Sequence, residues 1–101
     1  GHSMQLSEGP SGRVSIGKRA LEDYIAVLSQ EIYGIYNVKV IAKLEDESIN
    51  VRINASLEPG INIPETTGEV KNNVKESIKK MTGVEVKDIE VYFKQIKAKE
   101  E

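Results

Sequence analysis

The chain has 101 residues, with 14 lysine and arginine residues against 16 aspartate and glutamate residues, and its formal net charge is −2. This length holds one domain with one modest core, and the acidic balance disfavours a globally basic nucleic-acid binder. The sequence contains no cysteine, which excludes disulfides, thiol catalysis and cysteine zinc sites.

The two ends of the chain are expected to lie outside the fold. Residues 1–4 are interpreted as the remnant of a purification tag, and residues 5–11 as a flexible lead-in because they are rich in Gly, Ser and Pro. His2 is the only histidine, and one histidine cannot form a coordination shell, so no metal site is expected. The charged residues 97–101 are expected to be frayed. No run of about 20 apolar residues is present, so we expect no membrane-spanning helix within this sequence.

The predicted elements begin with a short strand at 13–16 and a helix over about 18–33. Ser15 offers an N-cap for the helix, and Gly34 ends it because glycine enters the left-handed conformation without strain. The apolar residues of the helix share one face: Leu21, Tyr24, Ile25, Leu28 and Ile32.

Alternation with a period of two then predicts strands at 36–44 and 49–57. The second strand is the more regular, with apolar residues at every other position: Ile49, Val51, Ile53, Ala55 and Leu57. The short polar turn at 45–48 predicts that the two strands form an antiparallel hairpin.

A second helix and a last strand complete the predicted order. Pro64 suits the first turn of the helix, and Gly83 closes it. The helix has an apolar stripe formed by Val70, Val74, Ile78 and Met81. Alternation at 89–94 predicts the final strand.

The order β-α-β-β-α-β predicts a single α+β domain with two helices on one face of a mainly antiparallel four-stranded sheet. A ferredoxin-like split arrangement is the default for this order, although the sequence does not define the order of the strands in the sheet. Deep burial is expected for the central residues of the apolar stripes: Ile25, Leu28, Val51, Ile53, Val74, Ile78 and Val91.

The search for catalytic residues gives no constellation that we assign to an active site or a cofactor. The cluster Glu45-Asp46-Glu47 lacks the loop length and the mid-loop glycine of a calcium site. The loop 58–65 leads into a helix but lacks the Gly-Lys-Ser/Thr ending of a phosphate loop. A Ser–Lys dyad is compatible with the residue types, but no motif supports one. We therefore expect no catalytic residues, no cofactor, no small-molecule substrate and no enzyme activity.

Strand alternation gathers basic residues on the sheet face opposite the helices, which we call the open face. The candidate partner surface on this face consists of Lys39, Ile41, Lys43, Arg52, Tyr92 and Lys94, and its polar neighbours are Asn50, Asn54, Ser56 and Glu90. RNA-binding sheets stack bases on two or three aromatic residues, whereas this face offers Tyr92 alone. A solvated sheet face is therefore the simpler interpretation, and a surface for a partner is the alternative.

Several segments between Gly12 and about Ile96 together resemble the alkaline shock (general stress) protein family of Gram-positive bacteria. They are Gly12-Arg-Val-Ser-Ile16, Glu31-Ile-Tyr-Gly-Ile35, Pro59-Gly-Ile-Asn-Ile-Pro-Glu65 with Val70 and Val74, and Met81-Thr-Gly-Val84 followed by Val86 through Ile96. Residues 12–96 are accordingly identified as an alkaline-shock-like domain, and the order and spacing of the segments carry the resemblance.

The resemblance implies a non-enzymatic interaction or scaffold role in the envelope stress response, in which the domain binds itself or a paralogue of the family. Some members are soluble, and others resemble the alkaline shock response membrane anchor protein, in which membrane helices precede one such domain; the sequence fits both. The implied location is the cytoplasm, at the inner face of the plasma membrane for an anchored parent. The alternative function is a small RNA- or DNA-binding domain that uses the basic open face.

Overall fold

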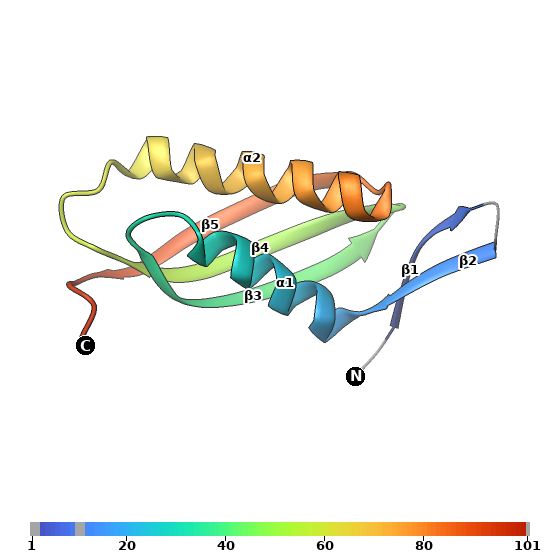
Figure 1. Cartoon of the computed structure of the whole chain (residues 1–101), viewed down its shortest axis with the longest axis horizontal. Coiled ribbons are helices and arrows are strands. Elements are labelled where there is room, and N and C mark those ends of the chain that lie inside the picture. The colour runs from blue at the N-terminus through green and yellow to red at the C-terminus, as the bar shows by residue number, and fades with distance from the viewer. Residues whose placement is uncertain (1–2, 10–11, 101) are drawn as a thin grey trace.

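The structure, a computed structural model, describes residues 3–9 and 12–100. Its elements are β1 (Ser3–Gly9), β2 (Gly12–Gly17), α1 (Lys18–Gln30), β3 (Ile35–Glu45), β4 (Ser48–Leu57), α2 (Ile63–Thr82) and β5 (Val86–Ile96). Both helices pack on one face of a sheet with the order β3-β4-β5, while β1 and β2 form a separate ribbon that projects from one end (Figure 1). The predicted α+β class with two helices on one sheet face is confirmed.

The predicted four-stranded, mainly antiparallel sheet is wrong. β3 and β4 form the expected antiparallel hairpin, but β5 runs parallel to β4 and is its direct neighbour. A split ferredoxin-like arrangement would need the first strand between these two, and their direct hydrogen bonding leaves no place for it. The strand predicted at 13–16 is present as β2, but it pairs with β1, in residues where the sequence predicts a tag remnant and a flexible lead-in, and not with the sheet.

α1 starts at Lys18, as predicted, but it ends at Gln30 and its N-cap is not the predicted Ser15. The helix begins at Lys18 after Gly17, which has an extended backbone and no side-chain cap, whereas Ser15 lies inside β2. The ends of α2 follow the expected rules. Asn62 accepts a hydrogen bond from the Glu65 N–H at 2.8 Å, and Gly83 closes the helix in the left-handed conformation.

The acidic cluster forms the tight turn between β3 and β4. Asp46 and Glu47 connect the two strands, and both have positive φ angles, of 50° and 63°. Two successive left-handed residues match the right-handed twist of a two-residue hairpin, which explains the turn without a bound ion. Within residues 3–9 and 12–100, no group of three or more His, Asp or Glu side chains is placed to hold a metal.

The core lies between the helices and the sheet. Its fully buried side chains include Leu21, Ile25, Ile49, Ile53, Leu57, Val70, Val74 and Ile78. Of the residues expected to be deeply buried, Val91 alone is only partly buried, and Phe93 on the same strand is partly buried as well. Both lie on β5, a strand at the edge of the sheet, where the helices cover the apolar face incompletely.

Glu22 of α1 hydrogen-bonds to β3, the strand at the other edge of the sheet. Its Oε2 atom accepts hydrogen bonds from the Ala42 N–H of β3 at 2.9 Å and from Lys18 Nζ at 2.6 Å. Burial by itself raises the pKa of Glu22. The two hydrogen bonds and the charges of Lys18 and Arg19 together lower the pKa by more than burial raises it, so the pKa lies below its ordinary value.

We expect Glu22→Gln to lower the free energy of unfolding at pH 7 by about 1–2 kcal/mol, because a charge-assisted hydrogen bond becomes neutral. A folded-state pKa below the unfolded one gives stability that is present above the unfolded value and lost as the pH falls through the folded one. The difference between wild type and variant should therefore shrink in urea melts at about pH 3. The exposed Asp23→Asn serves as the control, and an equal deficit at both pH values would contradict a stabilising role for the Glu22 carboxylate.

Candidate interaction surface

The open face is built from rows of side chains that cross the three strands. The β3–β4 and β4–β5 registers define the rows Lys39–Asn54–Tyr92, Ile41–Arg52–Glu90 and Lys43–Asn50–Asp88. These residues share a face because side chains on a strand alternate between its two sides.

The structure places the residues of the predicted partner surface in solvent. Lys39, Ile41, Lys43, Arg52, Tyr92 and Lys94 are all exposed, and the apolar members Ile41 and Tyr92 expose 47% and 52% of their surface. Lys94 falls where the β4–β5 register shifts between Phe93 and Gln95, so it has no directly paired neighbour. The geometry brings these residues together, and their role as a binding surface stays a prediction.

The charge on the open face is divided between its two edges. Arg52 Nε lies 3.3 Å from Glu90 Oε1, and Asp88 lies on the same face one row away. Asp88 is absent from the predicted surface, although extending the alternation from Glu90 by one step would have found it. Lys39 and Lys43 therefore lie on the β3 side, while β5 carries the carboxylates Asp88 and Glu90 beside Lys94, so the face is less basic than the sequence suggests.

A hollow of about 400 Å³ lies on this face, lined by Ile41, Lys43, Asn50, Val51, Arg52, Asp88 and Glu90. The Oδ1 atom of Asn50 is buried there without a hydrogen-bond partner among the described residues. A buried amide oxygen without a hydrogen-bond partner is costly. Sequence reasoning missed this feature because it depends on the burial of one atom.

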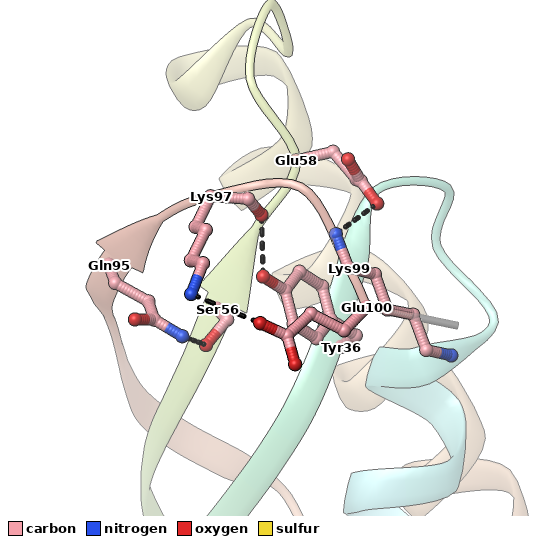
Figure 2. A network of polar contacts seen from close by, with 7 residues as sticks. All are labelled: Tyr36, Ser56, Glu58, Gln95, Lys97, Lys99 and Glu100. Carbon is pink, nitrogen blue, oxygen red and sulfur yellow. Dashed lines mark hydrogen bonds and ion pairs between the residues drawn. The ribbon is translucent and has the colours of Figure 1, made fainter.

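At the far end of the open face, a polar network ties the C-terminal residues to β3 and β4 (Figure 2). Gln95 Nε2 donates to Ser56 Oγ at 3.0 Å, and Ser56, expected on the solvated face, is fully buried. The Tyr36 hydroxyl donates to the Lys97 carbonyl, and the Lys99 N–H donates to Glu58 Oε1 at 2.9 Å. Lys97 and Lys99 are therefore each held by a hydrogen bond to the rest of the fold, and the fraying expected of residues 97–101 stays a prediction.

Two helices on one side of a three-stranded sheet, with the other side uncovered, define a two-layer α+β domain with an open sheet face. A family model described as Asp23 family, cell envelope-related function, matches residues 36–98. The chain therefore belongs to this alkaline shock protein family, whose name is unrelated to residue 23 of this sequence. The match spans β3, β4, α2 and β5, so the resemblance noted for residues 12–35 lies outside it.

No curated protein matches the chain. In the part of the chain that the structure describes, no helix combines the length and the apolar character needed to cross a membrane.

Proposed function

We propose that this protein is a non-enzymatic interaction domain with a scaffold role in an envelope stress response. Its partner is a second copy or another member of the family, bound through the open face. Membership of a family with a cell envelope-related function supports the process. For the full-length protein we propose a place in the cytoplasm, at the inner face of the plasma membrane where the parent carries an anchor.

The single observation that carries the proposal is the pair Ile41 and Tyr92. Both apolar side chains are about half exposed on the open face, Ile41 on β3 and Tyr92 on β5, with β4 between them and charged side chains of both signs nearby. An aromatic and an aliphatic residue inside a charged border have the anatomy of a protein–protein interface.

We expect Tyr92→Ala and Ile41→Ser each to weaken binding of a second copy or a paralogue by about tenfold, because each removes apolar area that the bound partner would bury, and tyrosine is enriched among interface hot spots. Calorimetric titration would measure the affinity. Tyr33→Ala is the matched control, since Tyr33 is 84% exposed and lies in the turn between α1 and β3, away from the open face. Equal effects of the Tyr33 and Tyr92 variants would contradict the proposal.

A titration with labelled single-stranded RNA at low and moderate salt tests the alternative function, which is binding of RNA or DNA through the open face. Binding that is sensitive to salt and is lost in Lys43→Glu and Arg52→Glu would replace the protein-binding proposal with a nucleic-acid one. RNA that stays unbound at low salt would remove that alternative.

A further inference from the structure

Among the residues that the structure describes, no strand lies beside the outer edge of β5, because the three-stranded sheet ends there. The β4–β5 register shifts near both ends of β5, at Lys87 and at Lys94, and between these positions residues 88–93 pair regularly with β4. The edge therefore offers one regular segment of six residues, bounded by lysines at the irregular positions.

The hydrogen bonds at both ends of β5 show which backbone groups point outward. The Lys97 N–H donates to the Leu57 carbonyl, and the Glu85 carbonyl accepts from the Ile49 N–H, each at 3.0 Å. Backbone groups alternate between the two sides of a strand in step with the side chains. The Lys97 N–H and the Glu85 C=O therefore point toward β4. Each register shift adds one residue to β5, so the alternation changes phase once near each end of the strand. Between the two shifts, the N–H and C=O groups of Ile89, Val91 and Phe93 point away from β4.

This outward set is self-complementary when a second β5 runs antiparallel beside it with Val91 opposite the partner's Val91. Ile89 then lies opposite the partner's Phe93, and the outward groups form about six hydrogen bonds in three reciprocal pairs. The partly buried Val91 and Phe93 gain the cover on the helix side that they lack in a single copy.

Charge on the open face selects the same register. Asp88 lies opposite the partner's Lys94, and Glu90 lies opposite the partner's Tyr92. A register centred on Glu90 would place two glutamates opposite each other, and one centred on Tyr92 would place the apolar Ile89 opposite the partner's Gln95. Opposite charges across a strand pair stabilise it, and like charges destabilise it.

We propose that two copies of this domain associate through their β5 edges. The two β5 strands run antiparallel and join the two sheets into one continuous sheet of six strands, with the two-fold axis at Val91. The inference rests on the proposed function for the identity of the partner, a second copy, but not for the surface. Ile41 lies on β3, so Ile41→Ser leaves the β5 association unchanged while it weakens binding through the open face. The two proposals can therefore fail independently.

Cysteine cross-linking tests the register, because the natural sequence has no cysteine. Glu90 and the partner's Tyr92 form a non-hydrogen-bonded pair with Cα atoms about 4.5 Å apart, within reach of a disulfide. Two Glu90 positions lie roughly 8 Å apart diagonally, which is too far. We expect an oxidised mixture of Glu90→Cys and Tyr92→Cys chains to form a disulfide dimer, and either variant alone to form little. Equal cross-linking of the single variants would overturn the register.

Charge variants provide a second test that needs no oxidation. We expect Asp88→Lys or Lys94→Asp to weaken self-association in sedimentation equilibrium by about tenfold, since each variant puts like charges opposite each other. An equimolar mixture of the two variants should associate again, because the mixed pair restores opposite charges. Lys80→Asp, on the exposed side of α2, is the control and should associate like wild type. A wild-type chain that sediments as a monomer at about 1 mM, or a mixture that stays monomeric, would overturn the proposal.

Discussion

Ile53→Ala is expected to lower the free energy of unfolding by about 2–5 kcal/mol, the range for truncating a buried aliphatic side chain. Ile53 lies in β4, the central strand, is 1% exposed, and belongs to the core that both helices contribute to. A domain of this size has a total stability of about 5–15 kcal/mol, so the loss is a large share of it. Urea unfolding would measure it.

The neighbouring Asn54→Ala is the matched control for this prediction. Asn54 lies on the open face and is partly exposed, so its loss should stay near 0.5 kcal/mol, as is usual for surface changes. Similar losses for both variants would show that the open face is covered in solution, contrary to the one-sided packing described above.

Gly34→Ala is expected to cost about 2–4 kcal/mol, because two effects add. Gly34 has a φ of 91°, a left-handed conformation that strains any residue with a Cβ atom. A Cβ added there would lie 2.8 Å from Ile61 Cγ1 and 3.0 Å from Cδ1. The backbone cannot easily move away, since the Gly34 carbonyl accepts the Glu58 N–H at 2.8 Å.

Gly60→Ala separates the two effects. Gly60 has a φ of 83°, but a Cβ there would meet nothing within 4 Å, so only the backbone strain of about 1–2 kcal/mol remains. Adding Ile61→Ala to Gly34→Ala should cost less than the sum of the two single changes, because the close contact disappears. Thermal or urea melts in which both glycine variants lose the same amount would refute the role of Ile61.

The elements that were predicted well are those whose signals are local in the sequence. The start of α2 near Pro64, its stop at Gly83 and its buried stripe at Val70, Val74 and Ile78 follow from local signals, although Met81, also assigned to the stripe, is 49% exposed. The β3–β4 hairpin needs only two alternating runs and a short turn. The same alternation placed Lys39, Ile41, Lys43, Arg52 and Tyr92 on one exposed face before the strand order was known.

The elements that were missed depend on pairing between distant residues. The periodicity of β5 does not show whether β5 pairs directly with β4 or is separated from it by another strand. Because β5 pairs directly with β4, it lies at the edge of the sheet, and Val91 is only partly buried. The unpartnered oxygen of Asn50 follows from burial of a single atom, which a residue pattern cannot express. β1, the partner of β2, lies in a polar segment with little strand-forming character.

The carboxylate of Glu22 at the β3 edge has a consequence for the size of any assembly. A sheet with two free edges can add copies at both ends and grow without limit, whereas a sheet with one free edge has a valency of one. In this domain α1 lies along β3 and its Glu22 occupies the Ala42 N–H, so a strand arriving there would first have to displace the helix. If two copies join through β5 as proposed, each uses the free edge of its three-stranded sheet, and the β3 edge, where Glu22 already binds the Ala42 N–H, is not available to a third copy.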